Sequence, residues 1–198
     1  MFFESTMANI HYLIDNVFVV SKEQLDVFFL DTVDSENVEF YTNQLIDQKF
    51  LTLQSNRNFL IKKDFAKEKT EYNRTYIKTT SVYPISSSFF DDIVKIFWCV
   101  AYCKSSQIKD VFTFSIDPAQ IMFVTTDGDL YDVTMCSSLT KAHYASIKRK
   151  AFQVPGVEDD VCHIALVNNE ETGMRMKDYG FDLYCILQEN NEPEYFQT

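Results

Sequence analysis

Asparagine and glutamine side chains between residues 37 and 44 are of the types that read DNA bases. Asn37, Asn43 and Gln44 carry amide groups, which can pair bidentately with adenine. Arginine and lysine side chains, which can hold phosphates, follow a little further along the chain. The residues predicted to contact nucleic acid are Asn37, Phe40, Asn43, Gln44, Arg57, Lys62 and Lys63.

Local patterns predict two helices and a hairpin that would position these side chains. Ser21 followed by Gln24 matches a capping box at a helix start, and the polar residues 31–35 end that helix. The expected elements are a first helix through Phe3, Met7, Ile10 and Ile14, an extended link at 17–20, a helix from Ser21, a second helix at 36–48, and strands at 50–54 and 59–63. This order predicts a winged helix-turn-helix, in which the second helix of the pair enters the major groove.

Acidic residues in the same stretch oppose DNA binding. Glu36, Glu39 and Asp47 would share the exposed face of the second helix and repel phosphates. The whole chain has a net charge of −11, and neither half has the basic excess of a strong DNA binder. The alternative is an acidic protein-interaction module that does not bind DNA, one version being a decoy for the basic groove of a nucleic-acid enzyme.

Composition indicates a folded protein with a substantial core. Hydrophobic residues make up 46% of the 198 residues and aromatics 15%, which argues against disorder. The N-terminus lacks the pattern of a signal peptide, and the longest apolar stretch, 93–102, is too short to span a bilayer, so a cytoplasmic location is expected. The five cysteines are predicted to be reduced core residues, because no Cys or His spacing completes a zinc site.

The second half predicts a mixed α/β domain. A boundary near 65–85 would divide the chain into a winged-helix domain at 1–80 and an α/β domain at 81–198. Predicted elements are a helix at 89–104 capped by Ser88, strands at 111–116, 120–125 and 130–136, a helix at 139–152, a strand at 163–167, a helix at 170–179 and a strand at 181–187. The tail from Gln188 is polar and expected to fray. The fold class is therefore α+β, in the order α-β-β-β-α-β-α-β.

Catalysis has one candidate pattern in this half. The strand order resembles the restriction-endonuclease-like fold, in a degenerate form, whose nucleases hold a metal with an Asp and an acidic-x-Lys pair. Asp132-x-Thr134 has the acid but lacks the lysine, which leaves Asp117 as the partner acid and Lys141 or Lys148 as substitutes. A divergent metal-dependent nuclease is thus a further alternative. Lys141, Lys148, Arg149 and Lys150 form the one basic cluster of this half, either a solvated helix face or a phosphate-binding or partner-binding face.

Several strand and turn segments resemble those of a family of small, uncharacterised proteins encoded in conjugative and mobile elements of Firmicutes. The chain is also distantly similar to the replication-relaxation proteins of such elements. The segments that carry the resemblance are 118–123, 127–133, 163–167 and 181–185. The resemblance implies an N-terminal winged helix before a compact α/β domain, and a setting among DNA transactions. It implies no catalytic residues.

These observations predict a non-enzymatic DNA-binding or accessory protein of a mobile element. No catalytic residue, metal or cofactor is expected. The predicted partners are double-stranded DNA, or else a protein partner or a second copy bound through residues 81–198, and no membrane.

Overall fold

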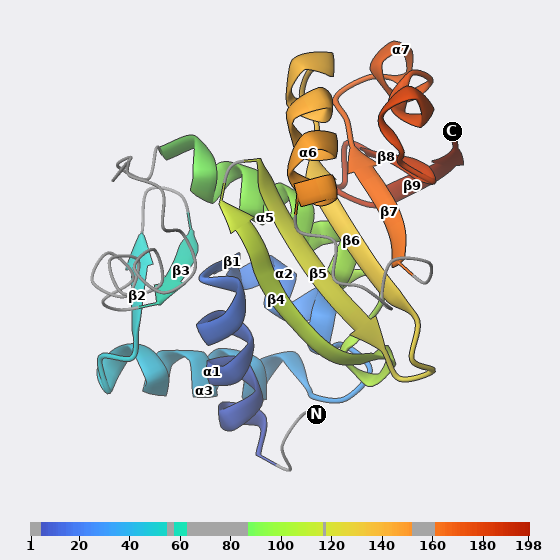
Figure 1. Ribbon diagram of the computed structural model, residues 1–198. Coiled ribbons are helices and arrows are strands. Elements are labelled where there is room, and N and C mark those ends of the chain that lie inside the picture. Colours follow the sequence, from blue (N-terminus) through green and yellow to red (C-terminus); the bar gives the residue numbers. More distant parts are fainter. Residues whose placement is uncertain (1–4, 55–57, 63–86, 117, 152–160) are drawn as a thin grey trace.

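A computed structural model describes residues 5–54, 58–62, 87–116, 118–151 and 161–198 of the chain. These residues form a mixed α+β fold with a three-stranded and a six-stranded sheet (Figure 1). The predicted α+β class is therefore confirmed. The predicted boundary segment 65–85, Asp117, Arg57 and Lys63 lie outside the described residues.

The N-terminal part begins with helix α1 (Thr6–Val17), strand β1 (Val19–Ser21), helix α2 (Lys22–Phe29) and helix α3 (Ser35–Asp47). The capping box at the start of α2 is present. The Gln24 backbone N–H donates to Ser21 Oγ at 3.1 Å, and the Ser21 N–H donates to Gln24 Oε1 at 2.9 Å. Gln24 is fully buried, and its side-chain amide also donates to the Val94 carbonyl, so this cap ties α2 to a helix of the second half.

Strands β2 (Leu51–Gln54) and β3 (Phe59–Lys62) form the predicted hairpin, and β1 joins it on the far side of β3. All pairings in this small sheet are antiparallel. Leu60 of the central strand β3 lies between Val20 of β1 and Leu53 of β2. Leu60 is completely buried, as expected for the central strand. The sheet thus anchors the short hairpin to the end of α1.

The six-stranded sheet runs in the order β4-β5-β6-β7-β8-β9. Its strands are β4 (Ile108–Ile116), β5 (Ala119–Thr125), β6 (Leu130–Met135), β7 (Val161–Leu166), β8 (Leu183–Leu187) and β9 (Pro193–Gln197). β6, β7 and β8 are parallel, and the other pairs are antiparallel. Gly128 turns the predicted β5–β6 hairpin with a φ of +99°, a conformation that glycine adopts without steric cost.

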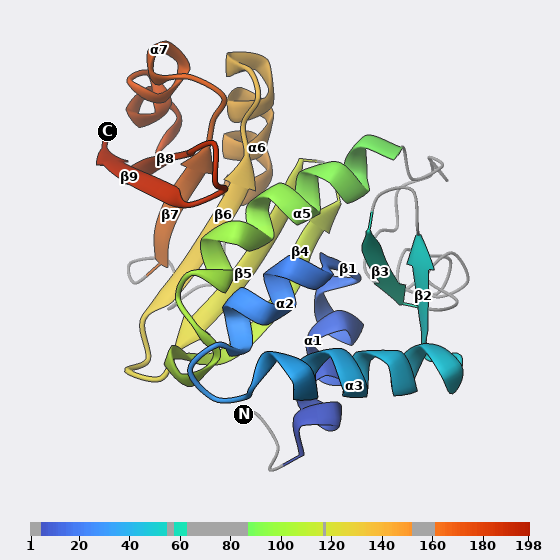
Figure 2. The same ribbon diagram turned by 180° about the vertical axis from the view of Figure 1, so that it is seen from behind.

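Helices cover both faces of this sheet. α5 (Ser87–Ala101) lies across the face seen in Figure 2, with α2 beside it and α3 at the periphery. α6 (Leu139–Ala151) covers the other face, where Ala142 and Ala145 pack with Ala165, Phe181 and Tyr184. Short helices η1 (Ser105–Gln107), α7 (Glu170–Gly173) and η2 (Met176–Tyr179) complete the described elements.

One hydrophobic cluster crosses the predicted domain boundary. Leu13, Leu25 and Phe28 of the N-terminal part belong to the same buried cluster as Phe97 and Ile121 of the second half. Phe28 and Phe97 face each other with ring centroids 5.8 Å apart. The two parts therefore share a core, and their division into domains at 1–80 and 81–198 stays a prediction.

Two predictions about the C-terminal part were wrong. The expected helix at 170–179 is broken into α7 and η2, with Arg175 between them outside helical geometry at φ −96° and ψ 0°. The tail does not fray but forms β9, and Phe196 stacks on Tyr184 at 5.0 Å. The polarity of the tail misled the prediction, and Pro193 is tolerated here because it is the first residue of an edge strand.

Candidate functional site

The outer face of α3 carries the residues predicted to read bases. Asn37, Phe40 and Asn43 are exposed and Gln44 is half-buried, while Val38 and Leu45 face the core. The helix thus presents the predicted face to solvent. Phe40 is 54% exposed and packs edge-on against Tyr41, with ring centroids 5.3 Å apart.

Lys62 does not provide a free charge on the hairpin. Its ammonium group lies 2.7 Å from the Asp15 carboxylate of α1, and its side chain is only 14% exposed. The ion pair fixes β3 to α1 rather than leaving Lys62 available to a phosphate. Arg57 and Lys63, the other two basic residues predicted to hold DNA, lie outside the described residues.

Acidic residues dominate α2, α3 and the turn between them. Residues 22–49 contain two lysines against seven Asp and Glu, a net of −5, which is nearly half of the charge of the whole chain. Asp31 is held by hydrogen bonds from Ser105 and Ser106. Within the described part of the chain, no hydrogen bond or ion pair engages the carboxylates of Asp26, Glu36 or Glu39.

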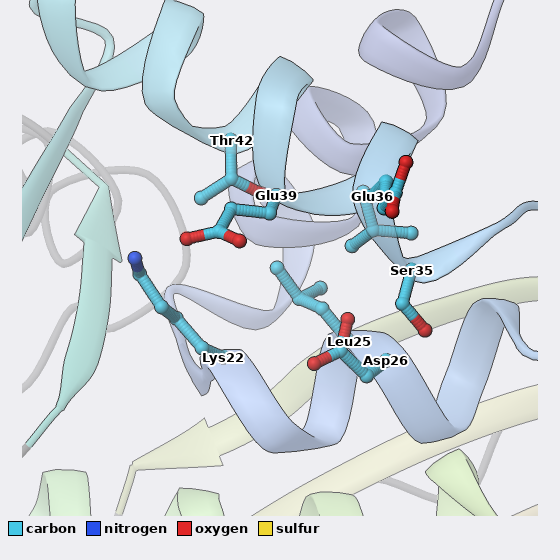
Figure 3. A pocket seen from close by; sticks show the side chains of 8 residues that line it. Lys22, Leu25, Asp26, Ser35, Glu36, Glu39 and Thr42 are labelled. Atoms are coloured by element: carbon cyan, nitrogen blue, oxygen red, sulfur yellow. The ribbon is translucent and has the colours of Figure 1, made fainter.

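A pocket of about 250 Å³ lies between α2 and α3, and these three acids are among the residues that line it. Figure 3 shows Lys22 and Asp26 on α2, with Glu39 of α3 reaching toward Lys22 and with Glu36 and Thr42 also on α3. Ser35, Leu25 and Val38 complete the lining. The pocket is thus a partly apolar hollow with three carboxylates and one lysine at its walls.

Two groups in this pocket are in unfavourable surroundings. Burial raises the pKa of Asp26 above its ordinary value, and the nearby Glu39 raises it further, against a smaller opposing effect of Lys22. Thr42 is 1% exposed, and its hydroxyl oxygen has no hydrogen-bond partner among the described residues. A buried hydroxyl without a partner destabilises a fold.

A second polar cluster lies under α6, at the amino ends of the parallel strands. Asp132 of β6 and His163 of β7 are directly opposite in the register, and His163 Nδ1 is hydrogen-bonded to Asp132 Oδ2. The other carboxylate oxygen of Asp132 accepts from Thr134 Oγ1 at 3.5 Å. The backbone N–H of His163 donates to Asp182 at 2.8 Å. The Asp132 side chain is 3% exposed and that of His163 27%.

Arg149 of α6 approaches this cluster. Its Nη2 donates to the Tyr179 carbonyl at 2.7 Å, and its guanidinium lies 3.9 Å from the centre of the Phe181 ring. Burial lowers the pKa of Arg149, opposed by the charges of Asp132, Cys136 and Asp182. Its Nη1 is buried and has no partner among the described residues. An Asp–His pair can transfer protons, since the carboxylate fixes the tautomer and orientation of the ring.

Among the described residues, the side chains of the nuclease pattern do not come together. Asp132 is engaged by His163 and Thr134, and Lys141 pairs with Asp92 of α5 at 3.4 Å instead of reaching Asp132. Lys148 lies over the Tyr144 ring at 5.0 Å. The described residues contain no group of three His, Cys, Asp or Glu placed to hold a metal ion. A metal-dependent nuclease built on these residues gains no support from this arrangement.

The cysteines lie mostly in the core as free thiols. Cys99, Cys136 and Cys185 are buried, and Cys103 and Cys162 half-buried. Cys99 and Cys185 bring their sulfur atoms within 3.7 Å across α5 and β8. Burial raises the pKa of Cys136 to about 12, which makes that thiol unreactive near neutral pH.

Comparison with protein-family models, curated proteins and solved structures gave no match for this chain. The expected relationship to mobile-element proteins therefore stays a prediction. Among the described residues, no helix has the length and apolar character needed to cross a membrane.

Sequence reasoning missed both polar clusters. Asp132 was considered as a metal ligand, but its pairing with His163 depends on the register of two parallel strands that are distant in sequence. Asp26 was not considered at all. Its place one helical turn after Lys22, opposite the acidic face already noted on the second helix, was the available signal.

Proposed function

We propose that this protein is a non-enzymatic interaction protein that binds a basic, partly apolar segment of a partner protein on the exposed faces of α2 and α3. The surface comprises Phe40 and the acids around it, Glu36, Glu39 and Asp47, together with the adjoining pocket. Charge complementarity selects a lysine- or arginine-rich partner. A second copy of the chain is a poor occupant, because two such faces would repel each other.

One observation carries this proposal, namely an exposed aromatic ring surrounded by unpaired carboxylates. Exposed aromatic side chains are typical anchors of protein interfaces, and a rim of charge steers the partner and excludes others. Phe40 is 54% exposed, and Glu36, Glu39 and Asp47 are exposed around it on α3. On this reading, α1 to β3 form a winged helix-turn-helix used for protein docking, on a second part that is a degenerate restriction-endonuclease-like scaffold.

DNA binding is the second candidate, favoured by the exposed amides of Asn37 and Asn43 on the same helix. It would use the winged helix in the usual way, with α3 in the major groove. The net charge of −5 over residues 22–49 and the pairing of Lys62 with Asp15 count against it. A role as accessory factor of a mobile element rests on the family resemblance alone and fits either candidate.

Fluorescence anisotropy with two labelled probes separates the candidates. One probe is an amphipathic peptide that alternates lysine with leucine, and the other is a short random duplex. If the proposal is right, the peptide should bind with an affinity that falls as the salt concentration rises, and the duplex should not bind. Duplex binding without peptide binding would overturn the proposal and favour the second candidate.

Two variants locate the peptide on the α3 face. Glu39→Lys should weaken peptide binding by about tenfold or more, and Phe40→Ala should weaken it several-fold. The matched control is Glu171→Lys, which makes the same charge change at an exposed acid on α7. An equal loss of peptide affinity in Glu39→Lys and Glu171→Lys would mean that net charge alone governs binding. The assignment of the binding site to the α3 face would then be wrong.

A further inference from the structure

The pocket between α2 and α3 points to a more specific ligand than a basic surface in general. We infer that it seats the guanidinium group of one arginine side chain from the partner. The inference rests on the proposed function, since it names the chemical group that the same surface selects. Its basis is the set of polar groups that converge on the pocket without partners.

The lining of the pocket is acidic. Asp26, Glu36 and Glu39 line the pocket from two helices, and Lys22 is the one cation among the lining residues. The lining therefore has a net charge of −2 when all four groups are ionised. A bound cation would relieve the repulsion between Asp26 and Glu39, which together with burial raises the pKa of Asp26 in the free protein.

Thr42 contributes a buried hydroxyl without a partner among the described residues. This side chain lines the pocket, is 1% exposed, and has no hydrogen-bond partner for Oγ1 among the described residues. An N–H donor entering from the pocket would satisfy it. Thr42 is an observation independent of the acids, because a hydroxyl contributes no net charge and its lack of a partner is a matter of geometry.

The pocket suits the guanidinium group of an arginine better than the ammonium group of a lysine. A guanidinium presents five N–H donors in a plane, and it is more weakly hydrated than an ammonium group, so it suits a partly apolar site with acceptors on several sides. Here carboxylates stand on both helices, Thr42 offers a hydroxyl, and Leu25 and Val38 supply apolar contact. A lysine ammonium would satisfy fewer of these acceptors at once.

No metal ion fits these groups equally well. The described residues contain no cluster of three His, Cys, Asp or Glu that could hold one, so the three carboxylates stand too far apart for a common ion. A guanidinium with its attached aliphatic chain bridges wider gaps than an ion does.

The test compares labelled oligo-arginine and oligo-lysine of equal length on the full chain and three variants. Wild type is expected to bind oligo-arginine several-fold more tightly than oligo-lysine. Asp26→Asn should weaken oligo-arginine binding by about tenfold, and Thr42→Val by several-fold, with a smaller effect on oligo-lysine. Asp47→Asn is the matched control, because Asp47 is exposed on α3 but does not line the pocket.

Each outcome has a distinct meaning. Equal losses in Asp26→Asn and Asp47→Asn, or equal affinity for the two peptides, would overturn the arginine pocket while leaving the acidic docking surface intact. If wild type bound none of the three peptides, oligo-arginine, oligo-lysine or the amphipathic lysine–leucine peptide, the proposed function itself would be overturned. Thermal unfolding of each variant excludes loss of fold as the cause of weaker binding.

Discussion

The α2–α3 pocket and the cluster under α6 contain similar polar groups in opposite circumstances. In the cluster under α6, both oxygens of Asp132 accept hydrogen bonds from residues of the same sheet. In the pocket, the carboxylate of Asp26 has no such bond among the described residues, and the Thr42 hydroxyl is buried without a partner. The Asp132 carboxylate therefore has its hydrogen bonds within the chain, although Nη1 of the neighbouring Arg149 lacks a partner, whereas Asp26 and Thr42 have none among the described residues.

This difference distinguishes polar groups that support the fold from polar groups that we propose for binding a ligand. A buried network whose members satisfy each other stabilises a unique arrangement of strands. Unpaired groups on a surface reduce stability, and proteins keep them where binding or chemistry requires them. Removing a polar group should therefore destabilise the protein under α6 and stabilise it in the α2–α3 pocket.

The largest expected effect is that of Asp132→Ala. This change leaves His163 and Thr134 without their buried partner, so the free energy of unfolding should fall by about 2–4 kcal/mol. Denaturant unfolding followed by circular dichroism measures the change. Peptide binding by the folded protein should be unaffected, because the cluster lies on another face.

Two further variants control this prediction. Asp132→Asn keeps one carbonyl acceptor for His163 and should lose less stability than Asp132→Ala. Asp129→Ala removes an exposed carboxylate three residues earlier and should change stability by under about 0.5 kcal/mol. If Asp132→Ala proved as stable as Asp129→Ala, the cluster would not be a support of the fold, and its contrast with the pocket would fail.

Much of the fold followed from local sequence signals. The capping box of Ser21 and Gln24, the alternating strands β4 to β6 and the turn at Gly128 were predicted because each depends on residues close together in the chain. β9 was missed because the polar tail shows no strand pattern, although its pairing with β8 is local. One of its contacts is also distant in sequence, since Tyr195 donates to the Cys99 carbonyl.

The candidate site was predicted only in part, for the same reason. The exposure of Asn37, Phe40 and Asn43 followed from helical periodicity. The pocket needed the contact between α2 and α3, which brings Asp26 against Glu39. The ion pair of Lys62 with Asp15 likewise joins β3 to α1, and no local pattern indicated it.

The second prediction concerns Thr42→Val, which tests the pocket side of the contrast. Valine has nearly the shape of threonine without the hydroxyl, so the change removes a buried group that lacks a partner. The free energy of unfolding should rise by about 1 kcal/mol. Thr32→Val is the matched control, because the Thr32 hydroxyl is hydrogen-bonded to Ser105 at 2.6 Å. That variant should lose stability, and a gain in both would show that the missing partner of Thr42 is not the cause.

The smallest expected effect is that of Asp26→Asn, and its sign depends on pH. The folded state raises the pKa of Asp26 above its ordinary value of 3.8, chiefly through burial and then through Glu39. Between the ordinary pKa of Asp26 and its raised pKa in the folded state, the folded protein binds more protons than the unfolded chain. Wild type therefore loses stability as pH rises through that window.

At neutral pH the variant, which has no carboxylate to ionise, should therefore be more stable, with a melting temperature higher by about 1–3 °C. Well below pH 3.8 the advantage should disappear, because Asp26 of wild type is then protonated in both states. Melting curves of both proteins from neutral to acidic pH measure this difference. A constant gain at every pH would mean that the asparagine acts through something other than the lost charge, and the pocket would no longer be a site of electrostatic strain.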